Sequence, residues 1–129
     1  MTTAFLEGLN LDGVGLYYST SNKTTNVPSG TDNHTVCSTI GLQAGKYVVY
    51  GKILYANNST GYRICSIDTK DTIATNDFVA QNAINGARTG IQHIRILALS
   101  AASTVYLIGR QNSGSQLGTT SNLVALRIV

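Results

Sequence analysis

Tryptophan is absent from this chain of 129 residues, which has only one proline, one methionine and two cysteines. Charged residues make up 12% of the sequence, about half the usual share. No segment approaches the ~18 consecutive apolar residues that a membrane span needs, so we expect no membrane insertion. The first residues also lack the basic start and apolar core of a signal peptide. The net charge of +3 comes from scattered Lys and Arg, and without a basic run or stripe we expect no nucleic-acid partner.

The chemistry of catalysis and of metal binding is also missing. There is no C-x-x-C pair and no Cys/His cluster, because His34 and His93 are far apart, so we expect no metal and no cofactor. All acids except Glu7 lie in or beside expected turns, where Asp is common for local hydrogen bonding. His93 and Arg95 share one strand face and are interpreted as a buried or subunit-facing polar pair. We therefore expect no enzymatic activity and no catalytic residues.

The composition favours strands and turns. There are 13 glycines, and Thr, Val, Ile and Tyr suit a pleated surface, whereas Asn and Gly suit turns. The length is that of one domain that can fold without disulfides. Cys37 and Cys65 each lie between apolar or small neighbours in expected strands, and we interpret them as buried free thiols, with a disulfide between them as the alternative.

Residues 46–56, KYVVYGKILYA, form the strongest expected strand because both of its faces are apolar. One face carries Tyr47, Val49, Ile53 and Tyr55, and the other carries Val48, Tyr50, Leu54 and Ala56. A strand with one face in water would alternate more cleanly, so both faces should be covered, the second by another subunit. Gly51 should mark a bulge or a close approach of neighbouring backbone.

Further strands are expected at residues 35–40, 62–67, 91–99 and 104–108, with a weaker one around Phe78 and Val79. Residues 123–129 should form a final strand after a polar loop. Two short strands, at 4–6 and 15–18, precede the polar run 19–34, which we interpret as a loop or irregular edge. The expected organisation is an irregular segment at 1–34, a lead-in from a shaft, followed by one sandwich domain at 35–129.

The segments LQAGKYVVYGKILYANNSTGYRICSI, IRILALSAASTVYLIGRQNSG and NLVALRIV resemble the jelly roll of the tumour necrosis factor (TNF) and complement C1q superfamily. The Asn/Thr/Ser-rich loops resemble the version found at phage tail-fibre and receptor-binding protein tips. The resemblance implies an all-β, antiparallel β-sandwich jelly roll that forms trimers about a three-fold axis. The Gly-Asp turn and the acidic cluster of the animal members are missing, which disfavours animal-type signalling.

Two sets of residues follow as expectations. Amide, guanidinium and tyrosine groups near loops are the candidates for binding a carbohydrate: Asn57, Asn58, Tyr62, Arg63, Arg88, Arg110, Gln111 and Asn112. Residues on one face of the expected strands are the candidates for the trimer interface: Tyr47, Val49, Ile53, Tyr55, His93, Arg95, Leu97, Leu123 and Arg127.

The function that these expectations favour is a non-enzymatic, homotrimeric receptor-binding or capping head domain. It would act on a virion, at a phage tail or fibre tip, assemble in the host cytoplasm and recognise a host cell-surface carbohydrate outside the cell. The alternatives are a purely structural trimerisation or decoration domain of a virion or of a bacterial surface such as a spore coat, and a glycan hydrolase or esterase, which the lack of paired acids disfavours.

Overall fold

The computed structural model describes residues 17–39, 41–71, 73 and 77–128, and within them the chain forms eight strands. Four of them, in spatial order β1-β8-β3-β6, make the first sheet, and β2-β7-β4-β5 make the second. Their bounds are β1 Tyr17–Val27, β2 His34–Ser38, β3 Gly45–Tyr55, β4 Tyr62–Asp68, β5 Val79–Asn82, β6 Thr89–Leu99, β7 Tyr106–Gln111 and β8 Leu117–Arg127.

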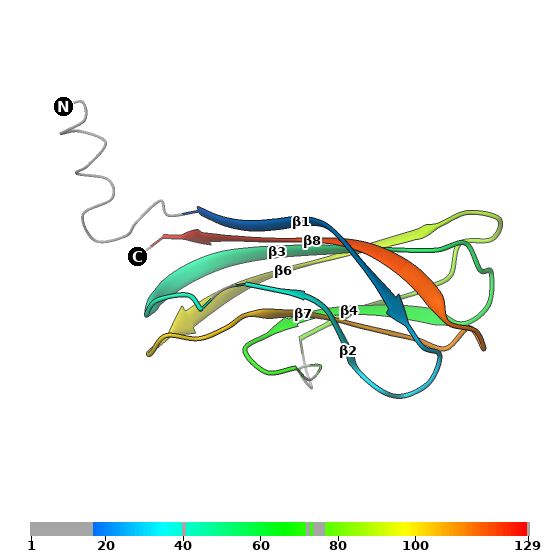
Figure 1. Cartoon of the computed structure of the whole chain (residues 1–129), viewed down its shortest axis with the longest axis horizontal. Coiled ribbons are helices and arrows are strands. Elements are labelled where there is room, and N and C mark those ends of the chain that lie inside the picture. Colours follow the sequence, from blue (N-terminus) through cyan, green and yellow to red (C-terminus); the bar gives the residue numbers. More distant parts are fainter. Residues whose placement is uncertain (1–16, 40, 72, 74–76, 129) are drawn as a thin grey trace, which may run out of the picture.

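All strand pairs are antiparallel, and the chain passes from one sheet to the other at every connection except the β4–β5 hairpin. Figure 1 shows the two sheets as stacked layers, with the end of β8 and the start of β1 at the same end of the sandwich. This is a jelly roll. The expected all-β sandwich is therefore confirmed.

β3, the strongest expected strand, is one of the two inner strands of the first sheet. It pairs with β6 along its whole length, from Gly45 opposite Leu99 to Tyr55 opposite Thr89, and with β8 on its other side. Gly51 lies within this unbroken register, so there is no bulge. A Cβ atom at Gly51 would lie 2.5 Å from Leu107 Cδ1, so the close approach is made by a side chain of the opposite sheet.

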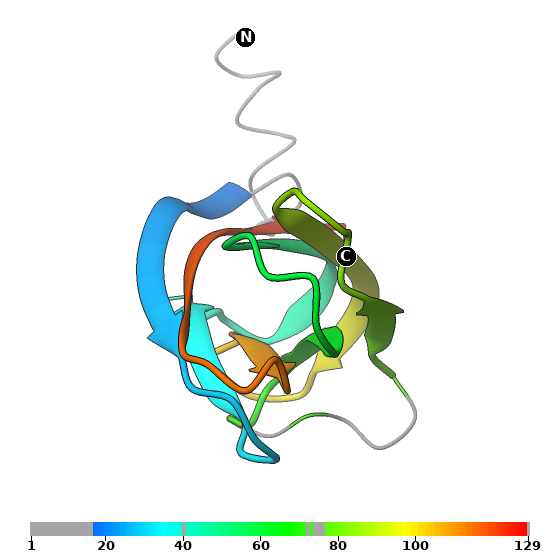
Figure 2. The same ribbon diagram turned by 90° about the vertical axis from the view of Figure 1, so that its right-hand side faces the viewer.

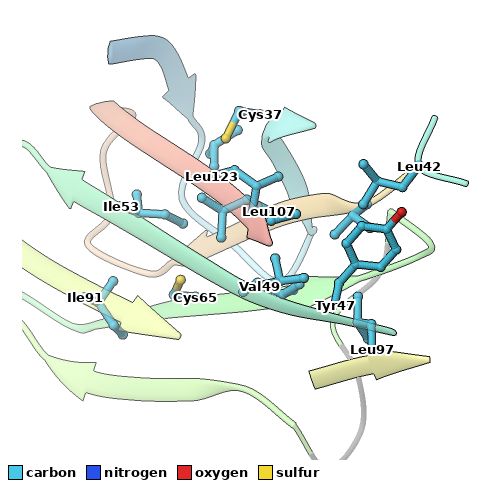
Figure 3. Close-up of a cluster of buried hydrophobic side chains, with 14 of the residues drawn as sticks. Cys37, Leu42, Tyr47, Val49, Ile53, Cys65, Ile91, Leu97, Leu107 and Leu123 are labelled. Atoms are coloured by element: carbon cyan, nitrogen blue, oxygen red, sulfur yellow. The ribbon is translucent and has the colours of Figure 1, made fainter. Parts of the chain in front are cut away.

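The core lies between the two layers, and Figure 3 shows side chains of both sheets meeting there. Tyr47, Val49 and Ile53 of β3 are fully buried against residues that include Leu107 and Leu123. The Tyr55 hydroxyl donates a hydrogen bond of 2.8 Å to the carbonyl of Ile64 in the second sheet. Both cysteines are buried, and neither forms a disulfide, which confirms the interpretation as buried thiols.

The polar run 19–34 was expected to be a loop or an irregular edge, and for residues 19–27 the loop is wrong and the irregular edge is right, because the register shifts between Thr20 and Lys23. Residues 17–27 form β1, an edge strand that pairs with β8 from Tyr17 opposite Leu126 to Val27 opposite Leu117. The strand exists because Thr is β-branched and because inward hydroxyls find backbone partners, as Thr25 Oγ1 does at the carbonyl of Val36. The sandwich thus begins before residue 35. The expected strand at residues 4–6 lies outside the described residues.

The last strand also begins earlier than the apolar pattern indicates, at Leu117 instead of 123. Its first half, LGTTSN, is polar, but Thr119 and Ser121 face inward and bond to carbonyls of β1. Figure 2 views the sandwich from the end where β3 passes into β4 and β7 into β8. The β5–β6 connection reaches the same end, since Thr89 lies opposite Tyr55. We call this end of the sandwich the loop end.

Candidate functional site

The outward face of the first sheet is apolar over part of β8, β3 and β6. Two cross-strand rows run across β6, β3 and β8 on this face, Ile96–Val48–Leu126 and Ile94–Tyr50–Val124. Ile94 and Ile96 are 64% and 63% exposed and Leu126 is 39% exposed. We call these six residues the apolar face. A contiguous exposed apolar patch of this kind often marks a site of interaction, whereas single exposed apolar residues are normal on a protein surface.

The alternation of the three strands creates this face. In β3 the residues at odd positions enter the core, so the even ones, Val48 and Tyr50, must point outward. Along the same face Lys52 follows, opposite Gln92 of β6 and Asn122 of β8. The apolar rows therefore end at a polar row before the loop end is reached.

The predicted trimer interface was placed on the opposite face, and this is wrong for seven of its nine residues. They lie between the two sheets of a single chain, where no second copy can reach them: Tyr47, Val49, Ile53, Tyr55, His93, Leu97 and Leu123. Arg95 and Arg127 are half-buried and occupy the same inward register. The physical reason is that strand alternation gives two apolar faces without saying which one the second sheet covers.

His93 and Arg95 form a polar seam between the two sheets. The His93 Nδ1 atom accepts a hydrogen bond of 3.1 Å from the Ile67 amide of β4, and its Nε2 lies 2.6 Å from Asp77 Oδ1. Arg95 donates to the Ile67 carbonyl over 2.7 Å, and its Nε lies 3.0 Å from Asp77 Oδ2. Asp68 Oδ1 lies 3.7 Å from Arg95 Nη1.

The seam contains a His–Asp pair, as many catalytic sites do, but the hydrogen bonds of the imidazole differ from those of a catalytic base. Since the Ile67 amide occupies Nδ1, the imidazole carries its proton on Nε2, which donates to Asp77. Both ring nitrogens are thus engaged inside the fold, and neither is available to take a proton from a nucleophile. The arrangement joins β6 to β4, which accounts for the polar pair expected from the sequence.

Two of the predicted carbohydrate-binding residues are structural. Arg63 is fully buried, and its guanidinium donates to the carbonyls of Asn58, Thr60 and Tyr62. It therefore clamps the β3–β4 loop. Burial lowers the pKa of this guanidinium.

Gln111 is equally buried, and it bonds to the Val27 carbonyl, the Ser115 carbonyl and the Ser113 amide. It thereby holds the β7–β8 loop against the end of β1. The prediction that Arg63 and Gln111 contact a ligand is wrong, because neither side chain reaches the surface.

The other six predicted residues are at least partly exposed at or near the loop end. Asn112 Oδ1 accepts a hydrogen bond of 2.6 Å from the Tyr62 amide, which ties the β7–β8 loop to β4. Arg110 donates to Asn33 Oδ1 over 2.6 Å. Asn57 and Arg88 are exposed, and Asn58 and Tyr62 are half-buried.

A groove of about 250 Å³ lies at the loop end of the first sheet. We call it the Arg88 groove. Its lining combines hydroxyl, amide and guanidinium groups with a small apolar floor, and consists of Thr24, Thr25, Asn26, Leu54, Ala56, Arg88, Gly118, Thr119 and Thr120. Of these only Arg88 was predicted from the sequence. The sequence did not indicate that the end of β1 and the start of β8 line a groove, because a run of Thr, Asn and Gly has the composition of a loop.

Neither a metal centre nor a membrane span is built by the part of the chain that the structure describes. Those residues contain no group of three or more His, Cys, Asp or Glu side chains that could hold a metal ion. They also contain no helix long and apolar enough to cross a membrane.

The strand order and the two sheets define the fold as an all-β, antiparallel jelly roll. The chain matches no protein-family model and no curated protein. Among solved structures it is similar to Eiger TNF from S. frugiperda, with a TM-score of 0.60 and 11% identity over 90% of this chain and 94% of that one. It is also similar to VP2 of an infectious bursal disease virus subviral particle, with a TM-score of 0.58 and 12% identity over 86% of this chain. The match covers 32% of the VP2 chain, so this chain spans about a third of that protein. At such identities the likeness establishes the fold alone.

Proposed function

We propose that three copies of this chain assemble through the apolar face into a non-enzymatic head domain, which binds receptors at the tip of a phage tail fibre or a related virion appendage. Its ligand would be a host cell-surface glycan. The observation that carries the proposal is the exposure of Ile94 and Ile96 on the outward face of β6, at 64% and 63%, beside the apolar residues of β3 and β8. Two such side chains facing water on one strand are costly unless a partner covers them.

Further copies of the same chain are the occupants that fit this face. It is continuous over three strands, and such a sheet can pack against identical sheets about a symmetry axis. The resemblance to trimeric jelly rolls of fibre tips points to three copies. The polar row at Lys52, Gln92 and Asn122 would form the rim of that contact, as polar residues do in protein interfaces.

The loop end is the part that would meet a glycan. It lies opposite the end at which the described chain enters the sandwich, because Tyr17 pairs with Leu126 whereas Val27 pairs with Leu117. The loops there are rich in amide and hydroxyl groups, which suit sugars. Three-fold presentation would multiply weak individual contacts into useful avidity.

The experiment is adsorption of the purified, fluorescently labelled chain to a panel of bacterial cells and to an array of their envelope polysaccharides. The proposal expects saturable adsorption to some strains, competed by the unlabelled chain and by soluble polysaccharide from the same strain. Release of reducing sugar or acetate from those envelopes would instead identify the glycan hydrolase or esterase.

A second candidate is a purely structural trimerisation or decoration domain of a virion or bacterial surface. It is favoured by the inward placement of Arg63 and Gln111, which turns two of the expected ligand contacts into loop clamps. A chain that sediments as a trimer but adsorbs to no cell and no polysaccharide would support this candidate.

A further inference from the structure

The Arg88 groove offers polar groups that the fold itself does not use. Two threonines point inward and already donate hydrogen bonds within the fold. The Thr25 hydroxyl donates to the Val36 carbonyl, and the Thr119 hydroxyl donates to the Thr25 carbonyl. In contrast, the side chains of Thr24, Asn26 and Thr120 make no hydrogen bond with the described residues. They occupy neighbouring outward positions, since Thr24 lies opposite Thr120 and Asn26 lies opposite Gly118.

The floor of the groove is apolar and small. Leu54 of β3 lies opposite both Thr120 and Gly90, and it is half-buried. Ala56 is tied to the start of β8, because its amide donates to the Gly118 carbonyl over 2.9 Å. Gly118 lacks a side chain at the position that would fill the space beside Asn26. An apolar floor bordered by a few unused donors and acceptors is the usual design of a small-molecule site.

The charge at the groove is positive. Arg88 stands on its rim, is exposed and forms no ion pair with the described residues, and no acidic side chain lines the groove. Lys52 reaches toward the same place, because both its Cε and Leu54 Cδ1 lie within 4 Å of the position of a Cβ on Gly90. A guanidinium binds a carboxylate with paired hydrogen bonds, which a neutral sugar cannot offer.

We infer that the Arg88 groove binds a carboxylate-bearing sugar of the uronic acid class. Arg88 pairs with the carboxylate of the sugar. The ring hydroxyls form hydrogen bonds with Thr24, Asn26 and Thr120, and the C–H groups of the ring pack against Leu54. The inference rests on the proposed glycan-binding function and names its ligand class and its place. The groove stays open in the assembly proposed above, because the row at Lys52, Gln92 and Asn122 separates it from the apolar face.

The test compares glucuronic acid with glucose, which differ in a carboxylate and a hydroxymethyl group at one carbon. The full-length, isotope-labelled chain is titrated with each sugar to about 50 mM at low salt, and backbone amide shifts are followed by NMR. We expect shifts at residues 24–26, 54–56, 86–90 and 118–120 with both sugars. Glucuronic acid should bind about two- to fivefold tighter, the range of an exposed ion pair.

Three variants sharpen the test. Arg88→Gln should abolish the preference for glucuronic acid, whereas Lys70→Gln, which removes the same charge at the opposite end of the sandwich, should preserve it. Gly118→Val should block both sugars. It is expected to fold, because a Cβ there has its nearest contact at 3.6 Å, to Asn26 Oδ1, and valine suits a strand.

Absence of shifts in the groove with both sugars would overturn the inference, as would equal binding of the two or a preference that survives Arg88→Gln. Cell adsorption separates this failure from that of the proposed function. Adsorption that Gly118→Val leaves intact would place the receptor site elsewhere and overturn the groove assignment alone. Wild-type chain that shows the titration but adsorbs to no cell would count against the receptor-binding role, not against the groove.

Discussion

Replacement of Ile96 by aspartate is the most direct test of the assembly. Ile96 of β6 is 63% exposed and pairs with Val48, which pairs in turn with Leu126. The side chain makes little contribution to the core of its own chain. An acidic residue at this point should therefore leave the single chain folded and act on association.

The magnitude follows from the exposed fraction. Full burial of an isoleucine side chain is worth about 1.5–3 kcal/mol, and about two-thirds of this, or roughly 1–2 kcal/mol, is still available to Ile96 on association. Three copies give roughly 3–6 kcal/mol per trimer, which is about 10²–10⁴-fold in the dissociation constant. A carboxylate buried without a partner adds several kcal/mol for each copy. The variant should thus be a monomer at micromolar concentration.

Sedimentation velocity between about 1 and 100 µM measures this. The apparent mass of the wild-type chain should be three times the 13.7 kDa of one chain. The Ile96→Asp variant should have the mass of a single chain and an unchanged circular dichroism spectrum. Ile84→Asp is the matched control, because Ile84 is 45% exposed but lies between β5 and β6, off the apolar face. A folded wild-type monomer at the highest concentration, or a trimer that tolerates Ile96→Asp, would refute the reasoning.

Three other predictions concern the fold. Arg63→Met should cost about 2–4 kcal/mol and expose residues 57–61 to proteolysis, because the carbonyls of Asn58, Thr60 and Tyr62 lose their donor; urea unfolding and limited proteolysis measure both effects. Burial raises the pKa of Cys65 from 9.0 to about 12, so its stabilising contribution is complete below pH 9 and lost as the pH rises toward 12. Between pH 8 and 10.5 the wild-type chain should lose roughly 2 kcal/mol more than Cys65→Ala, and equal losses in urea unfolding would contradict this. Gly109→Ala should destabilise the chain, since its Cβ would lie 2.5 Å from Tyr55 Oη and displace the hydroxyl from the Ile64 carbonyl; a melting temperature equal to that of wild type would refute it.

The sequence predicts β3 itself well, because a run that is apolar on both faces and rich in Val, Ile and Tyr favours a strand. Which face enters the core was harder to predict. His93 and Arg95 made the inward face of β6 look like a surface, yet β6 is an edge strand, and its polar side chains reach out to Ile67 and Asp77 at the seam. The signal that could have decided the matter is Lys52, a charge on the outward face of β3.

The polar strands were missed for a different reason. β1 and the first half of β8 are built from Thr, Ser and Asn, whose composition also describes loops. What makes them strands is their mutual pairing, Thr24 with Thr120 and Thr25 with Thr119. Pairing between segments nearly a hundred residues apart leaves no local trace. The same long-range contacts decide that Arg63 and Gln111 turn inward, so the candidate site could be predicted only in its general location at the loops.

The apolar face and the Arg88 groove both lie on the outward side of the first sheet, and the order of outward residues along β3 keeps them apart. Val48 and Tyr50 give an apolar contact near one end, Lys52 interrupts it, and Leu54 supports a polar groove at the other end. If the apolar rows continued to the loop end, assembly would cover the groove. A Lys52→Leu variant should therefore strengthen association and weaken glucuronic acid binding together. Tighter assembly with unchanged sugar binding would mean that the groove lies clear of the contact whatever residue 52 is, and that the polar row has no separating role.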